Sequence, residues 1–301
     1  MVWIVSAVVA VVALWIFVNA PKRAVVALTH AAFRCRERKD WTGARKFYGE
    51  AYTLAGKMKE PLKSKLLWQI EILRASLLHR EGRIREAEDL FRQGFSKANA
   101  ESRPEHVLLY QGYLCWGDLC TDDGRFSEAE VHYRQAVTGD EQAGNIASVI
   151  FDLQRLADAL IRQERRGEAE EIIHRAITLE TKVVHAQLLS QGKNPAEHPV
   201  ISMSLPDLHF CREQYEDARR LYREKVAFWE KQVTRPDNVD VGHLQMRLAL
   251  CEAKTGHRAE AVEMFTRAES TFQREWGEKH PKTSAARAAK AALTDEEVPV
   301  R

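Results

Sequence analysis

The sequence predicts an all-α protein built from six copies of one helix hairpin, and three observations lead to this fold. A pattern of small and aromatic residues, clearest over Gly124–Ala136, recurs every 40 to 49 residues. Its Ala129, Tyr133 and Ala136 are spaced i, i+4, i+7, which places them on one helical face. Glycine (15) and proline (9) are scarce among the 301 residues, and 45% of residues are hydrophobic. We therefore expect an ordered chain with enough apolar surface for a core.

The second helix of each copy carries the strongest signal. The copies align on its first alanine, at Ala44, Ala87, Ala129, Ala169, Ala218 and Ala261. A large side chain follows four positions later, at Tyr48, Phe91, Tyr133, Ile173, Tyr222 and Phe265. Three further on stand Ala51, Gly94, Ala136, Ala176, Lys225 and Ala268. A turn is expected five residues before each first alanine, where the chain has Gly82, Gly124 and Gly256, or Lys39, Glu164 and Glu213.

The first helices are expected over residues 24–38, 64–80, 107–121, 147–163, 200–211 and 240–254. A small residue marks the helix crossing in five copies, at Ala32, Ala75, Gly117, Ala157 and Ala249. In the fifth copy Pro206 stands there, and because proline removes a backbone hydrogen bond we expect that helix to be kinked or shortened. Such a helix would make the joint between copies four and five irregular. This irregularity is either a flaw that the array tolerates or a functional hinge. A capping helix over 282–293 and a frayed tail over 294–301 are expected to follow.

Residues 2–18 contain no charged side chain, and Ser6 is the one polar residue among them. At about 1.5 Å per residue they would form roughly 25 Å of helix, the short end for crossing a bilayer. They predict an uncleaved transmembrane anchor, with a cleaved signal peptide as the alternative. Lys22 and Arg23 follow directly, so the remainder is expected to be cytoplasmic in a single-pass membrane protein. Five cysteines without a regular framework agree with a reducing compartment.

The repeated pattern resembles the tetratricopeptide repeat, whose second helix reads Gly-x-Tyr-x-x-Ala-x-x-x-Phe-x-x-Ala. The period near 42 and the dipeptides His198-Pro199 and His280-Pro281 resemble the longer form found in kinesin light chains. The resemblance covers about residues 24–293. It implies an α-solenoid, a superhelix of hairpins whose concave groove binds a peptide or protein.

By that resemblance, one first-helix position faces the groove, at Phe33, Ser76, Asp118, Asp158, Asp207 and Leu250. Three consecutive copies place an aspartate there, and such a row would attract Lys, Arg or backbone N–H groups of a bound peptide. Apolar residues at adjacent positions would hold its side chains: Ile72, Leu114, Met203, Phe210 and Met246. The alternative is that the aspartates pair with neighbours such as Arg155 and Arg162, or are simply solvated.

No sequence motif of catalysis is present, and Cys115 and Cys120 lack the second pair of a zinc site. We therefore predict a protein that is not an enzyme and needs no metal or cofactor. The 45 basic and 43 acidic residues give no reason to expect nucleic acid as a partner. The predicted function is a membrane-anchored adaptor that recruits a protein or peptide partner, one with basic residues. The alternative is a structural, self-associating component of a membrane complex, and the oligomeric state is left open.

Overall fold

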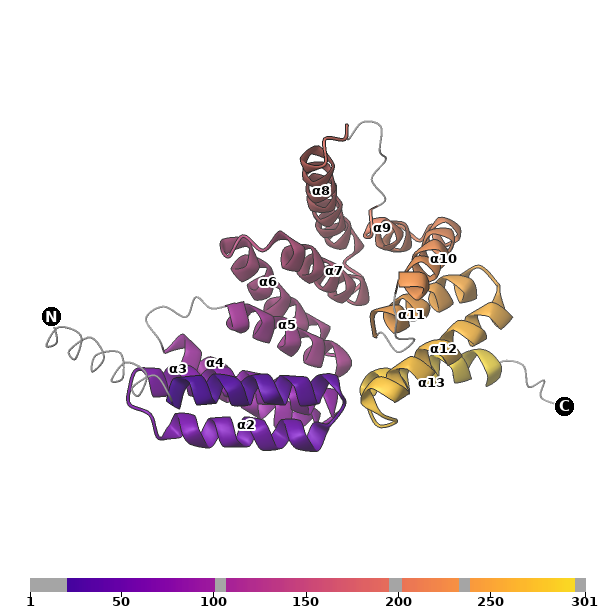
Figure 1. The fold of residues 1–301 in the computed structure, drawn as a ribbon. Coiled ribbons are helices and arrows are strands. Elements are labelled where there is room, and N and C mark those ends of the chain that lie inside the picture. The colour runs from indigo at the N-terminus through magenta and orange to yellow at the C-terminus, as the bar shows by residue number, and fades with distance from the viewer. Residues whose placement is uncertain (1–20, 101–106, 195–201, 233–238, 296–301) are drawn as a thin grey trace, which may run out of the picture. The chain divides into compact units, whose positions relative to one another are not determined.

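The computed structural model describes residues 21–100, 107–194, 202–232 and 239–295. These residues form helices joined by short turns and contain no strand, which confirms the predicted all-α class (Figure 1). Of the tail expected over 294–301, residues 294 and 295 are helical, whereas residues 296–301 and the His198-Pro199 dipeptide lie outside the described residues.

Helices follow one another along the chain as the repeat predicts. The first helices of the copies are a segment at 21–37, α3 (Leu62–Arg80), α5 (Val107–Asp122), α7 (Ile146–Arg162), α9 (Leu205–Cys211) and α11 (Val239–Lys254). The second helices are α2 (Trp41–Gly56), α4 (Ile84–Asn99), α6 (Phe126–Gln142), α8 (Arg166–Ser190), α10 (Tyr215–Gln232) and α12 (Arg258–Trp276). A last helix, α13 (Pro281–Asp295), packs on α12.

The chain divides into two compact units, Met1–Gly112 and Tyr113–Arg301, called unit 1 and unit 2 below. In both units the repeated small residues form the core. All six first alanines of the second helices are fully buried, and the large side chains four positions later are at most 2% exposed. Because small side chains at these positions let two helices approach closely, the repeated pattern explains the packing within each hairpin.

The turn between the two helices of a copy has one geometry whatever residue stands there. All six turn positions have positive φ, from 59° at Glu213 to 82° at Gly256. The next residue then donates its N–H to the carbonyl five residues earlier, as from Arg125 to Cys120 at 2.8 Å and from Arg165 to Leu160 at 3.0 Å. This bond satisfies a carbonyl that the end of the first helix leaves without a partner.

Replacing Glu164 with glycine should therefore stabilise the chain. A side chain at positive φ costs roughly 1–2 kcal/mol, and the freedom that glycine adds to the unfolded chain offsets up to about 1 kcal/mol. We expect Glu164→Gly to raise the free energy of unfolding by about 0.5–1 kcal/mol in urea titrations. Gly124→Ala is the matched reverse change, because no atom lies near the added Cβ, and it should lower the free energy by a similar amount. A loss of stability with Glu164→Gly would contradict this account of the turn.

The fifth first helix is shortened, as predicted, but Pro206 does not kink it. Helix α9 begins at Leu205, and Pro206 lies in its first turn, where a missing N–H leaves no helical bond unmade. Glu180 of α8 accepts hydrogen bonds from the Ser204 N–H at 3.3 Å and from the Ser204 hydroxyl at 2.8 Å. A side chain from the preceding copy thus caps the short helix.

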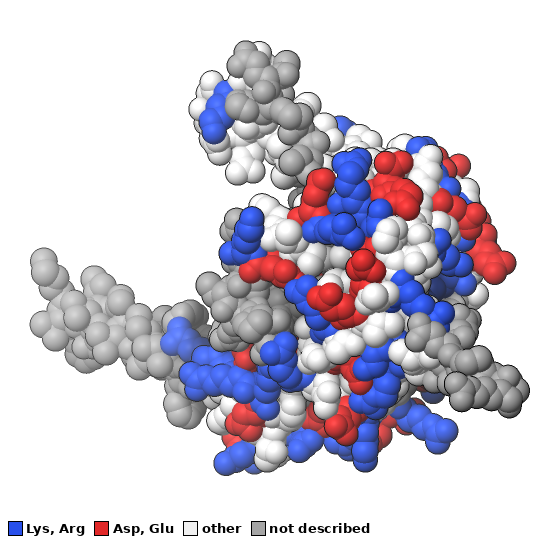
Figure 2. All heavy atoms as spheres, turned by 90° about the vertical axis from the view of Figure 1, so that its right-hand side faces the viewer, with Lys and Arg blue, Asp and Glu red and all other residues white. Residues whose placement is uncertain are grey.

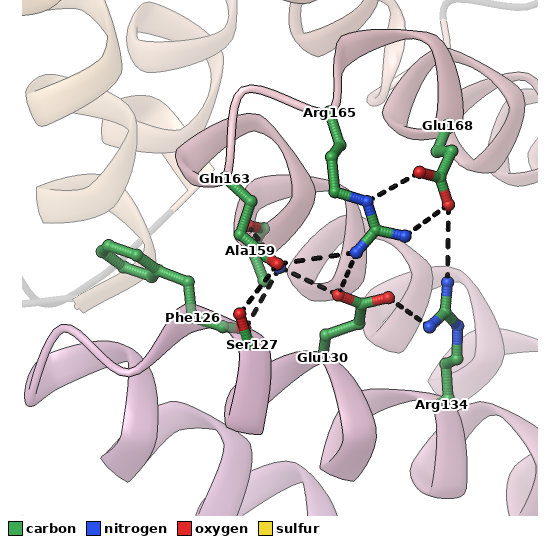
Figure 3. A network of polar contacts seen from close by, with 8 residues as sticks. All are labelled: Phe126, Ser127, Glu130, Arg134, Ala159, Gln163, Arg165 and Glu168. Carbon is green, nitrogen blue, oxygen red and sulfur yellow. Dashed lines mark hydrogen bonds and ion pairs between the residues drawn. The ribbon is translucent and has the colours of Figure 1, made fainter.

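Ion pairs join successive copies at one recurring position, the residue after the first alanine. The pairs are Arg45–Glu81, Glu130–Arg165, Glu170–Arg212 and Arg219–Glu252. In the pair of copies three and four, Glu130 accepts from Arg165 at 2.6 Å and from the Gln163 amide at 2.9 Å, and it also contacts Arg134 (Figure 3). The network ties the second helix of copy three to the turn of copy four.

One prediction is corrected. Among the residues that the structure describes, no helix combines the length and apolar character that crossing a membrane requires. This finding contradicts the predicted localisation as a single-pass membrane protein with a cytoplasmic domain. The segment on which that prediction rested, residues 2–18, lies outside the described residues.

Candidate functional site

The three aspartates of the predicted groove come from α5, α7 and α9, all within unit 2. Each is partly buried, and each has a polar partner inside the protein. The Tyr133 hydroxyl donates to Asp118 at 2.8 Å, and the Tyr222 hydroxyl donates to Asp207 in the same way. The aspartate and the tyrosine of each pair belong to the two helices of one copy. The aspartate therefore also anchors the large side chain of its own hairpin.

Asp158 differs from the other two aspartates, because Ile173 stands where its copy would place the tyrosine. Its partner is Arg247, which comes from α11 two copies later and forms an ion pair with the Asp158 carboxylate. Arg162 lies 3.8 Å from the same carboxylate oxygen. Burial acts to raise the pKa of Asp158, but Arg247, Arg162 and Arg155 outweigh it and hold that pKa below its usual value. Asp158 is therefore a stable anion.

Arg247 is the residue that sequence analysis missed. Its side chain is 16% exposed, and its guanidinium lies 4.8 Å above the Phe210 ring centre. It also lines a cavity of about 10 Å³, room for about one water molecule. The polar wall of this cavity is Gln154, Asp158, Ser204, Asp207 and Arg247, and the apolar wall is Ala157, Ile161, Ile173 and Ala176. Two of the predicted aspartates thus meet one arginine at one site.

The apolar residues of the prediction divide between the units. Leu114, Met203, Phe210 and Met246 belong to unit 2 and are partly buried. Phe210 and Met246 pack against the core around Tyr222 and Phe265. Ile72 is 1% exposed and belongs to unit 1. We call the side chains at these positions of α5, α7, α9, α11 and the turn before α9 the inner surface of unit 2: Leu114, Asp118, Asp158, Met203, Asp207, Phe210, Met246 and Arg247.

The alternative that the sequence left open, ion pairs between the aspartates and arginines of the same chain, is present on this surface. Arg155 lies 3.7 Å from Asp118, and Arg162 and Arg247 flank Asp158. The negative charges of the inner surface are thus largely balanced by arginines of the same chain. Whether a peptide binds there stays a prediction.

Beside the inner surface, two carboxyl groups are buried together. Asp152 of α7 is fully buried and lies near Asp140 of α6, which is 2% exposed. Burial, with added repulsion from Asp140 and Asp118, raises the pKa of Asp152 to about 8, against an opposing effect of Arg155. Burial also raises the pKa of Asp140. The pair therefore holds a proton at neutral pH.

Unit 1 has an open hollow of about 430 Å³ on α2, α3 and α4, lined by Arg45, Arg74, Leu77, Leu78, Arg83, Glu86, Asp89 and Leu90. Two of its arginines are engaged, since Arg45 pairs with Glu81 at 2.7 Å and Arg83 with Glu86 at 2.5 Å. Elsewhere, on the face drawn in Figure 2, acidic and basic side chains lie interspersed. Exposed pairs of this kind contribute little to binding or stability.

Comparison with known proteins identifies the fold. No protein-family model matches the chain, and no curated protein matches it either. The crystal structure of NprR in complex with its cognate peptide NprX superposes with a TM-score of 0.64 at 12% identity, over 94% of this chain and 75% of that one. The crystal structure of aspartyl phosphate phosphatase F from Bacillus subtilis superposes with a TM-score of 0.55 at 12% identity, over 96% of this chain and 75% of that one.

A tetratricopeptide repeat protein from Parabacteroides merdae gives a TM-score of 0.51 at 13% identity, over 91% of this chain and 97% of that one. Identities this low show the fold alone. The chain therefore has the tetratricopeptide-repeat type of α-solenoid fold that its sequence predicted, whereas the longer kinesin-light-chain form stays a prediction.

Proposed function

We propose that the chain is a non-catalytic adaptor that holds an extended segment of a protein partner on the inner surface of unit 2. One observation carries the proposal. Asp118, Asp158 and Asp207 recur at one register position of three consecutive first helices, and each stays partly exposed beside half-buried apolar side chains. NprR, which shares the fold, was solved with a bound peptide, and this supports peptide binding as a use of such an array.

The chemistry of this surface suits an extended peptide. A carboxylate has about four acceptor sites, so Asp118 and Asp207 can accept peptide N–H groups while keeping their tyrosine bonds. Met203 and Met246 are flexible and polarisable, and methionine side chains adapt to ligands of different shape. Because the aspartates already have internal partners, a peptide must add apolar contact to bind.

The test is a selection of binding peptides from a random display library on the purified full chain. The affinity of a labelled selected peptide is then measured by fluorescence anisotropy. We expect the triple variant Asp118→Asn, Asp158→Asn, Asp207→Asn to bind at least tenfold more weakly. Asparagine keeps the shape and an acceptor for each tyrosine, so circular dichroism melting should report an intact fold.

The matched control is the triple variant Asp89→Asn, Asp123→Asn, Asp217→Asn. These three aspartates are exposed and pair only with nearby arginines, at 3.8, 2.8 and 3.8 Å. The control should bind the peptide as the parent does. Equal affinity of both triple variants would place the peptide elsewhere and reject the inner surface as the binding site.

A further inference from the structure

Asp158 is the one aspartate of the row whose own hairpin supplies no tyrosine hydroxyl. Copies three and five have Tyr133 and Tyr222 for this purpose, and copy four has Ile173. Ile173 instead forms part of the apolar wall of the small cavity. The change leaves a partly buried carboxylate without a tyrosine partner, and such a carboxylate is stabilised by a cation.

The cation at this carboxylate is Arg247. Its guanidinium contacts a carboxylate and an aromatic ring, the two groups that commonly bind arginine at recognition sites. The Arg247 guanidinium pairs with Asp158, and its central carbon also lies over the Phe210 ring, 4.8 Å from the ring centre. A second carboxylate, Asp207, lines the same cavity. Planar, delocalised and always charged, a guanidinium suits a site with a carboxylate and an aromatic face better than an ammonium does. Arg247 reaches this site from α11, 89 residues along the chain from Asp158.

We propose that Asp158, Asp207 and Phe210 form an arginine-binding subsite, which the free chain fills with its own Arg247 and which a partner fills with an arginine of its peptide. The inference rests on the proposed function and specifies its ligand. Arg162, which lies 3.8 Å from Asp158, and Arg155 also act to lower the pKa of this carboxyl. Two cations of the chain's own therefore stay beside the subsite when Arg247 leaves.

When an arginine of the peptide replaces Arg247, one ion pair with Asp158 replaces another of the same kind. The attached Arg247 has a high effective concentration, so the apparent affinity for an incoming arginine is reduced in proportion to the occupied fraction. Contacts of the peptide with Met203 and Met246 must supply the difference. Removing the Arg247 guanidinium removes the competitor, and affinity for an arginine peptide should rise. A purely structural role for Arg247 predicts no such gain.

The experiment uses the full chain and two labelled probes, the pentapeptide amide Gly-Ala-Arg-Ala-Gly and its citrulline counterpart, which is neutral but nearly the same shape. We expect Arg247→Met to bind the arginine probe at least tenfold more tightly than the parent and to gain nothing for the citrulline probe. Methionine is unbranched and can pack on the Phe210 ring without a charge, so the fold should persist. Adding Asp158→Asn to Arg247→Met should remove the gain.

The matched control is Arg219→Met. Arg219 is similarly buried, at 19% exposed, and pairs with the buried Glu252 away from the inner surface. An equal gain in affinity for the arginine probe with this control would mean that the probe binds wherever a buried arginine has been removed. That result would overturn the proposal. A folded Arg247→Met variant without an arginine gain would overturn it as well. Should Arg247→Met not fold, Arg247→Lys serves in its place, with a gain of at least threefold expected from the weaker match of ammonium to the site.

The two proposals can fail separately. If the arginine probe gains nothing while selected peptides still lose affinity with the aspartate triple variant, the arginine subsite is wrong and the inner surface remains the binding site. If selected peptides are insensitive to the triple variant, the proposed function itself fails.

Discussion

Replacing Asp152 with asparagine will raise the free energy of unfolding at pH 8 by up to about 5 kcal/mol and will leave it nearly unchanged at pH 4. Burial raises the pKa of Asp152 in the folded chain to about 8, whereas an unfolded aspartate has a pKa near 3.9. Between these values the folded state binds more protons than the unfolded state, so this carboxyl lowers stability progressively as pH rises from about 4 to about 8. Asparagine does not ionise, and its amide can donate to Asp140.

The groups that face Asp152 are Asp140 from α6, Asp118 from α5 and Arg155 from its own helix. The measurement is urea unfolding of the parent and Asp152→Asn at pH 4, 6 and 8, and the quantity compared is the difference between them at each pH. Asp123→Asn, at an exposed position, should show no pH-dependent difference. If Asp152→Asn were less stable than the parent at pH 8, the buried carboxyl pair would not hold a proton as described.

Replacing Glu130 with alanine will lower the free energy of unfolding by about 2 kcal/mol. The Glu130 side chain is 5% exposed and accepts from Arg165 and Gln163 at 2.6 and 2.9 Å, besides its contact with Arg134 (Figure 3). Removing one partner of a buried ion pair costs roughly 3–5 kcal/mol. The expected loss is smaller here because both arginines are more than a third exposed and can turn to water.

Glu168→Ala is the control within the same network. Glu168 pairs with Arg165 at 2.5 Å but its side chain is 51% exposed, so we expect a much smaller loss of stability than with Glu130→Ala. A double-mutant cycle of Glu130→Ala with Arg165→Ala, followed by urea unfolding, should give a coupling energy of about 1 kcal/mol or more. Equal effects of the two glutamate substitutions would show that burial does not set the strength of this junction.

The fold could be predicted because it is set by short-range repetition. The alignment placed a turn at Glu164 although the residue there is not glycine, and the structure gives it the same positive φ as Gly124. Pro206 was predicted to shorten its helix, and it does so. What the pattern could not predict is the cap from Glu180, because that side chain belongs to the preceding copy. The membrane localisation, inferred from the apolar residues 2–18 and the basic residues that follow them, is contradicted.

The candidate site was predictable only in part. The register placed Asp118, Asp158 and Asp207 at equivalent positions, and the Asp–Tyr pairs within two hairpins could have been found from their constant separation. The Asp158–Arg247 pair could not have been predicted in this way. Periodicity indicates which face of a helix a side chain occupies, but it does not indicate which residue of a copy further along the chain contacts that side chain. The loss of tyrosine at Ile173 was the available signal that Asp158 takes a different partner.

Hydrogen–deuterium exchange of the full chain, with and without a selected peptide, tests the central claim most directly. The account predicts that the peptide slows exchange in α5, α7, α9 and α11, which carry the inner surface, and leaves the second helices α6, α8, α10 and α12 unchanged. Protection confined to those second helices, or to unit 1, would contradict it.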